Sequence, residues 1–126
     1  MAMAVQQIHP IAHLPLVLGV LRRLEVATII DRLIPPHPAH VLSCGRGVEA
    51  LVLAILDGDH ALYKVGKRLE ERGMVALLQP GLTRASLHDY RLGHILEALF
   101  AAHLNEVYSV IVLKALEVYT IPTIAA

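Results

Sequence analysis

The chain has 126 residues, enough for one domain with a hydrophobic core and too few for two such domains. Hydrophobic residues make up 56% and charged residues 17%, which is more apolar than a typical soluble domain, so we expect some apolar surface to be kept for a partner protein. Eleven basic residues balance eleven acidic ones, so overall charge gives no support to nucleic-acid binding, and the single Cys44 excludes an internal disulfide.

The uncharged stretch before Arg22 is interrupted by polar residues and prolines. A membrane-spanning helix needs about 20 predominantly apolar residues without such breaks, so this stretch is not predicted to be one. The interrupting residues are Gln6, Gln7, His9, Pro10, His13 and Pro15. The N-terminus also lacks the positive region of a secretory signal. We therefore expect a cytoplasmic protein with no membrane contact.

Residues 1–13 are predicted to form an irregular lead-in, because Pro10 and Pro15 lack a backbone donor. Apolar residues then recur at helical spacing and predict a helix over residues 14–24. These residues are Leu14, Val17, Leu18 and Leu21. A tight corner is expected at residues 24–26, followed by a second helix over residues 27–34, which the proline-rich segment 35–38 ends.

Ser43 is the predicted N-cap of a helix from Cys44 to about Asp57. That helix is apolar on nearly every side, which indicates a position in the centre of a bundle. Gly58 ends it. Asp59 is the predicted cap of a basic helix that ends at Gly73, because glycine favours the left-handed conformation found after helix C-termini.

A short apolar turn at residues 74–78 and a bend at 79–81 precede the next helix, which begins at Ser86 or His88. Its predicted core face consists of Leu92, Ile95, Leu96 and Leu99. After a turn at residues 103–105, a last helix runs to about Tyr119 and is apolar almost all round. Its β-branched residues leave a strand over residues 107–113 as the alternative, which its length disfavours.

These elements predict an all-α fold, a single compact bundle of about six helices. The helical domain is expected to cover residues 14–121, between the lead-in (1–13) and a C-terminal tail (122–126). No internal repeat or low-complexity segment divides it.

No arrangement typical of an active site is present. His37 and His40 lie three residues apart and His9 and His13 four apart, but neither pair has the further ligands of a zinc site, and loop or surface histidines are the preferred interpretation. Cys44 has no marked His or Asn partner, and the carboxylates are dispersed. We therefore expect no catalytic residue, no metal, no cofactor and no small-molecule substrate.

A stripe of basic residues follows one side of the predicted basic helix, opposite an apolar side. The stripe consists of Lys64, Lys67, Arg68 and Arg72. Such a stripe can contact a DNA backbone, but Glu71 can pair with Lys67 and Arg68 at helical spacing, which favours a solvated face. Arg84 and Arg91 extend the predicted DNA-binding patch if the fold brings them close.

Four segments in fixed order carry a family resemblance: residues 33–35 (LIP), 47–53 (GVEALVL), 61–65 (ALYKV) and 87–99 (LHDYRLGHILEAL). Together they resemble the N-terminal region of bacterial insertion-sequence transposases of the DDE, RNase-H-like class. In that branch the region is usually classed only as a domain of unknown function. The resemblance covers residues 14–121, and its most specific part is residues 87–99.

In such transposases, a segment similar to residues 113–119 is followed closely by a strand with the first catalytic aspartate. This sequence continues instead with residues 121–126 (IPTIAA). The resemblance therefore implies a transposase front end without its catalytic core. By the same resemblance, full enzymes cut and join DNA with two divalent metals held by three carboxylates, and none of those carboxylates can be placed on this sequence.

The resemblance thus implies a non-catalytic domain that binds transposon ends or assembles the transposase, in a bacterial cell and at the nucleoid if it binds DNA. We expect the apolar last helix to contact a transposase catalytic domain or a second copy of this chain as a homodimer. The alternative is a structural dimerisation module without nucleic-acid affinity, which includes a truncated regulator of transposition.

Overall fold

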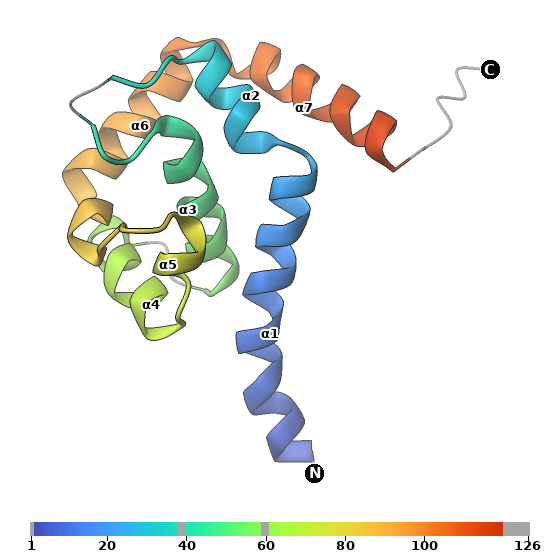
Figure 1. Ribbon diagram of the computed structural model, residues 1–126, viewed down its shortest axis with the longest axis vertical. Helices are drawn as coiled ribbons and strands as arrows, with labels where there is room; N and C mark the ends of the chain where they lie inside the picture. Colours follow the sequence, from blue (N-terminus) through green and yellow to red (C-terminus); the bar gives the residue numbers. More distant parts are fainter. Residues whose placement is uncertain (1, 38–39, 59–60, 120–126) are drawn as a thin grey trace.

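Helix α3 (Cys44–Leu56) lies at the centre of the molecule and packs against α1, α2, α4, α5 and α6 (Figure 1). In this computed structural model, the described residues are 2–37, 40–58 and 61–119, with only the backbone described for residues 2–12. Ala50 and Leu53 of α3 are fully buried, and the Ser43 hydroxyl caps the helix by accepting a hydrogen bond from the Arg46 backbone N–H at 3.2 Å. The predicted central position and N-cap are both confirmed.

All regular elements of the described residues are helical, which confirms the all-α prediction. Around α3 lie α1 (Ala2–Arg23), α2 (Val26–Leu33), α4 (Val65–Glu71), α5 (Val75–Leu78), α6 (Asp89–Ala101) and α7 (Leu104–Val118), with 3₁₀-helices η1 (Leu62–Lys64) and η2 (Arg84–Leu87). Buried apolar residues from α1 to α7 form one continuous core. The last helix is therefore a helix and not the alternative strand.

The irregular lead-in predicted for residues 1–13 is wrong for residues 2–13, because α1 begins at Ala2 and includes Pro10 and Pro15. A proline removes one intrahelical hydrogen bond and favours a kink, but the remaining bonds of a long helix continue past it. Leu14 and Leu18 on this helix are buried against the core. The N-terminal part of α1 extends away from the other helices (Figure 1).

The corner between α1 and α2 depends on a left-handed residue, Glu25, at φ 56° and ψ 37°. A non-glycine residue adopts this conformation at a cost, so the corner is held by its surroundings. Helix α2 then crosses α3 very closely at Gly45. A Cβ atom at this position would overlap the backbone of Ala27, so only glycine allows the contact. The predicted corner at residues 24–26 is confirmed, and Gly45 sets the distance between the two helices.

The predicted basic helix is shorter than expected, since it consists of η1 and the seven-residue α4. Asp59, its predicted cap, lies outside the described residues. The apolar side is confirmed, with Val65 and Leu69 buried, and Gly73 has the expected left-handed conformation at φ 69°.

Helix α6 begins after His88, whose Nδ1 accepts a hydrogen bond from the Arg91 backbone N–H at 3.1 Å. Its predicted core face is confirmed for Leu92 and Ile95, which are fully buried. The prediction is wrong for Leu96, which is 44% exposed because α6 packs on α3 and η1 through the adjoining side. Residues 120–126, including the predicted tail, lie outside the described residues.

Among the described helices, none is by itself long and apolar enough to cross a membrane. Helices α6 and α7 reach that length and composition only when taken together, and they are bent by 88° at the break between them. This bend brings α7 across α2 rather than in line with α6 (Figure 1).

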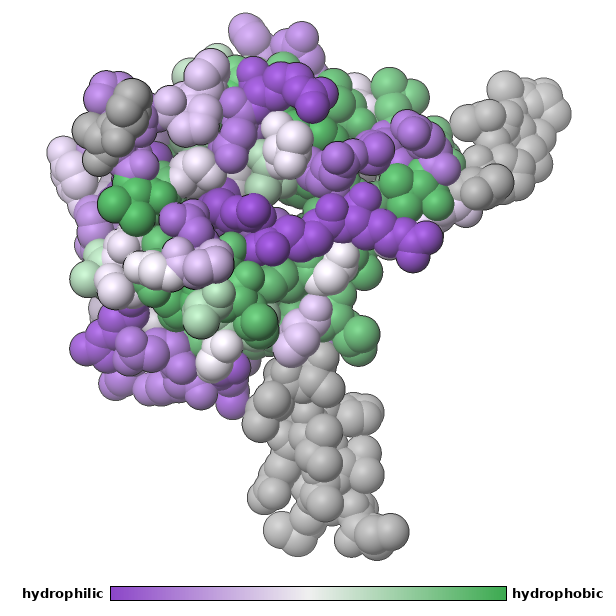
Figure 2. All heavy atoms as spheres, viewed as in Figure 1, coloured by the Kyte–Doolittle hydropathy of each residue, from purple (hydrophilic) through white to green (hydrophobic). Residues whose placement is uncertain are grey.

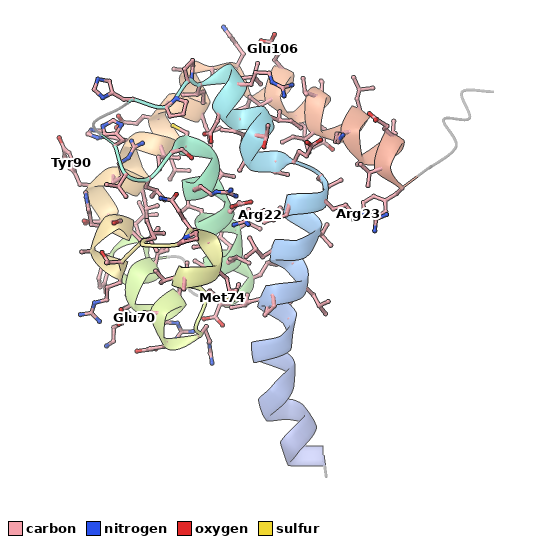
Figure 3. All side chains as sticks on the ribbon, viewed as in Figure 1. Arg22, Arg23, Glu70, Met74, Tyr90 and Glu106 are labelled. Carbon is pink, nitrogen blue, oxygen red and sulfur yellow. The ribbon has the colours of Figure 1, made fainter. Side chains whose placement is uncertain are left out.

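A buried carboxylate and the arginine that pairs with it join three helices beside the core. Glu49 of α3 is completely buried, and its two oxygens accept hydrogen bonds from Arg22 Nε and Arg46 Nη1, each at 2.9 Å. Arg22 extends from α1 toward α3 (Figure 3) and also donates through Nη2 to the carbonyls of Leu77 and Leu78 at 3.2 and 2.7 Å. One arginine therefore joins the C-terminal end of α1 to both α3 and α5.

Replacing Glu49 by glutamine is expected to lower the free energy of unfolding by about 1–3 kcal/mol, because an amide cannot accept from both guanidinium groups and stays buried. Urea denaturation followed by circular dichroism measures the change. The control is Glu97→Gln, which alters an exposed carboxylate on α6 and should change stability by less than about 0.5 kcal/mol. Equal stability of the two variants would show that the buried pairing contributes nothing.

Candidate functional site

The structure divides the predicted basic stripe into two free lysines and two paired arginines. Lys64 and Lys67 are exposed, and Lys64 Nζ lies 5.6 Å from the centre of the exposed Tyr63 ring. Tyr63, both lysines, Arg68 and Glu71 line a shallow hollow of about 340 Å³. In the described chain, no ion pair of Lys64 or Lys67 with a carboxylate is found, so both amines are available to an anionic ligand.

Arg68 and Arg72 are held by Asp57, the residue that ends α3. Arg68 Nη2 lies 3.1 Å from Asp57 Oδ2, and Arg72 Nε lies 3.1 Å from Oδ1. The Asp57 side chain is only 3% exposed. The expected neutralisation of the stripe is therefore present, but its carboxylate is Asp57 of another helix rather than Glu71. These two arginines attach α4 to α3.

Of Arg84 and Arg91, only Arg84 lies beside the stripe. Arg84, on η2 beside α4, lies near the stripe, and its Nη1 is 3.4 Å from Glu70 Oε1 in an exposed pair. Arg91 instead donates through Nη2 to the carbonyl of Leu42, in the loop that precedes α3, at 2.8 Å. The expectation that Arg91 extends the patch is therefore not met, because its side chain is used by the loop that leads into α3.

Among the described residues, α7 exposes several large apolar side chains. Only Val107 of this fifteen-residue helix is buried, although most of its residues are apolar. The exposed ones are Leu104, Tyr108, Val110 and Leu113, and Tyr108 and Leu113 are 70% and 65% exposed. On the face seen in Figure 2, hydrophobic residues reach the surface over α7 beside hydrophilic ones. The exposed apolar residues of α7 agree with the expectation, based on the high apolar content of the sequence, that some apolar surface is left uncovered.

Polar contacts hold α7 against the corner between α1 and α2. Lys114 Nζ lies 2.6 Å from Glu25 Oε2, and this hydrogen bond lowers the pKa of Glu25 and raises the pKa of Lys114. At the far end of α7, the guanidinium of Arg23 lies 5.2 Å from the centre of the Tyr119 ring. The orientation of α7 is therefore defined, although the helix contributes little to the core.

The described residues contain no group of three or more His, Cys, Asp or Glu side chains close enough to hold a metal ion. The rings of His37 and His40 lie 5.2 Å apart. Cys44 is buried, and burial raises the pKa of its thiol, which keeps it protonated at neutral pH and therefore weakly nucleophilic. Its position in the first turn of α3 therefore does not lower the pKa of the thiol enough to activate it as a nucleophile.

Sequence reasoning did not find Asp57 as the partner of the stripe. The available signal was the Gly58 break after it, which turns the chain back so that α4 packs on α3. It also missed the separation of Arg91 from the stripe, because that depends on the path of residues 40–43.

The fold and its surfaces define a small all-α domain with an apolar helix on its surface and an incomplete basic patch. A family model described as "Domain of unknown function (DUF4277)" matches residues 6–113 of the sequence. The chain belongs to this family. Searches of the curated proteins and of the solved structures found no match to the chain.

The two halves of the basic stripe are expected to differ in their effect on folding. Arg68→Gln should lower the free energy of unfolding by about 1–2 kcal/mol, because it removes a charged hydrogen bond to a buried carboxylate. Lys67→Gln, one position earlier and exposed, should change it by less than about 0.5 kcal/mol. Thermal and urea unfolding of both variants measure the difference, and a larger loss for Lys67→Gln would contradict the assignment.

Proposed function

We propose that this chain is a transposase-derived helical domain that acts in assembly rather than in catalysis, and that it associates with a second copy through α7. The observation that carries the proposal is the exposed apolar surface of α7, with a single buried residue in fifteen. Leaving side chains such as Tyr108 and Leu113 in water is unfavourable, and a protein partner removes that cost.

The sequence supports the transposase part of the proposal. Residues 33–35, 47–53, 61–65 and 87–99 resemble the region that precedes the catalytic core in DDE transposases. Membership of a family without assigned function neither adds to this resemblance nor opposes it. In a longer transposase the same surface of α7 would contact the catalytic domain. The surface therefore has two alternative partners, the catalytic domain or a second copy of this chain.

A second copy is the occupant to which we commit for this chain. A two-fold dimer places the same patch of both subunits against itself, so one apolar helix is sufficient to build the interface. The charged residues Glu106 and Glu117 are exposed, lie eleven positions apart on one side of α7, and suit a polar rim on that side of the interface.

Light scattering at micromolar concentration is expected to show a dimer. Leu113→Glu should weaken dimerisation by at least about tenfold, because it places a charge in the apolar centre of the interface. Its matched control is Leu16→Glu on α1, where the leucine is as exposed but lies away from α7. A monomer at all concentrations, or equal weakening by both variants, would overturn the assembly through α7.

DNA contact is the second candidate function, and the specific observation in its favour is the pair of unpaired lysines beside the 340 Å³ hollow on α4. Lysines without a protein partner release counterions on binding phosphates, whereas Arg68 and Arg72 must first leave Asp57. We therefore assign the proposed phosphate contacts to Lys64 and Lys67, with Arg84 beside them and with Arg91 removed from this set.

Fluorescence anisotropy with duplex DNA tests this candidate. Affinity should fall steeply with salt, and the double variant Lys64→Glu, Lys67→Glu should reduce the log–log salt slope by about 2, one unit for each lost phosphate contact. The control is Arg32→Glu, an exposed basic residue on α2, a helix that lies apart from α4 (Figure 1); it should leave the slope unchanged.

Absence of binding at low salt would remove the DNA function and leave the structural dimerisation module. Because α7 and the lysines are on different elements, the two functions fail independently in these experiments.

A further inference from the structure

A second hollow, of about 220 Å³, lies at the N-terminal end of α6, where Tyr90 is labelled in Figure 3. His40, Val41 and Leu42 line it from the loop before α3, and Ser86, His88 and Arg91 line it from η2 and α6. Among these described lining residues there is no carboxylate. The pocket therefore gathers hydrogen-bond donors and positive charge without a negative side chain to neutralise them.

Arg91 is placed in this pocket by its contacts and retains donors for a ligand. Its Nη2 donates to the Leu42 carbonyl at 2.8 Å, and its side chain also interacts with the Cys44 thiol. Among the described residues, the buried Nε has no hydrogen-bond partner. A guanidinium has five N–H donors; the buried Nε–H is out of reach of a ligand, so the donors left for the pocket are on Nη1 and Nη2. A partly buried cation with unused donors is stabilised by an anion.

His88 adds a donor to the same pocket. Its Nδ1 accepts a hydrogen bond from the Arg91 backbone N–H, so in the neutral ring the proton is on Nε2. The N-terminal end of a thirteen-residue helix also has a positive partial charge. Asp89, in the first turn, accepts from the Tyr90 backbone N–H and is not part of the lining.

The local field is positive at His40. The charge of Arg91 is the largest cause that lowers the pKa of His40, and burial and the neighbouring His37 and His94 lower it further. A site that disfavours an additional proton in this way favours a negative ligand. The Ser86 hydroxyl, which lines the pocket, supplies a neutral donor beside these groups.

We propose that this pocket binds a phosphate group, held by Arg91, His40 and His88. The volume of about 220 Å³ is ample for one phosphate, which enters as the free ion or as the terminal phosphate of a larger molecule. The inference uses neither α7 nor Lys64 and Lys67, and it therefore stands or falls separately from assembly and from contact with the DNA backbone.

The test is a titration of the ¹⁵N-labelled chain with inorganic phosphate, followed by NMR. We expect saturable shifts at the amides of Leu42, Ser86 and Arg91, and an upward shift of the His40 pKa when phosphate is present. Sodium chloride at equal ionic strength should give no such localised shifts. Absence of a saturable response in these amides would overturn the proposal.

Two variants define the site. His40→Ala and Arg91→Gln should each bind phosphate about tenfold more weakly, the effect of losing one charge-assisted hydrogen bond, while Lys67→Gln binds as the parent chain does. His40 is on an exposed loop, so its variant remains informative if Arg91→Gln fails to fold. Unchanged affinity in a folded His40→Ala and Arg91→Gln pair would exclude this pocket as the site.

Two further ligands identify the source of the phosphate. A duplex with a 5′-phosphate that binds more tightly than the same duplex with a 5′-hydroxyl, and that loses this advantage in His40→Ala, assigns the pocket to a DNA end. Equal binding of the two duplexes, together with saturable binding of inorganic phosphate, assigns it to a small phosphate-containing molecule. Equal duplex binding without a response to inorganic phosphate contradicts the site.

Discussion

The fold depends on satisfying one buried carboxylate. Removing Glu49 from water costs several kcal/mol, and that cost is offset only if both of its oxygens are paired with good geometry. Arg22 and Arg46 provide this pairing, and Arg22 also reaches two carbonyls of α5. The requirement therefore fixes the end of α1 against α3, and the corner at Glu25 then determines where α2 begins.

The two candidate surfaces, the basic stripe at α4 and the apolar surface of α7, differ in how far their residues also hold the helices together. Arg68 and Arg72 hold helices together, because they pair with the nearly buried Asp57 and so attach α4 to α3. Helix α7 is placed by α2 and by the ion pair between Lys114 and Glu25, yet it adds only Val107 to the buried core. The proposed assembly surface on α7 is therefore separate from the residues that hold the fold together, whereas the proposed phosphate contacts at Lys64 and Lys67 lie beside two of them.

Most of the helices were predictable because their apolar residues repeat at helical spacing and because Ser43 and Gly73 are residue types with specific roles at helix ends. The long α1 was not predictable, since two prolines argue locally against it. The pairs Arg22–Glu49 and Arg68–Asp57 join residues 27 and 11 positions apart, and no local pattern reveals them. For the candidate site, residue type identified the lysines, but only the packing showed which cations are already used.

The near absence of α7 from the core has a consequence for how such a domain evolves. Substitutions at Tyr108 or Leu113 change the outer surface while the contacts around Glu49 and the close crossing of Gly45 over Ala27 stay intact. The proposed assembly surface can therefore change on this helix under little constraint from folding. Among relatives, variation that follows the identity of the partner should concentrate on α7, whereas α3 should vary least.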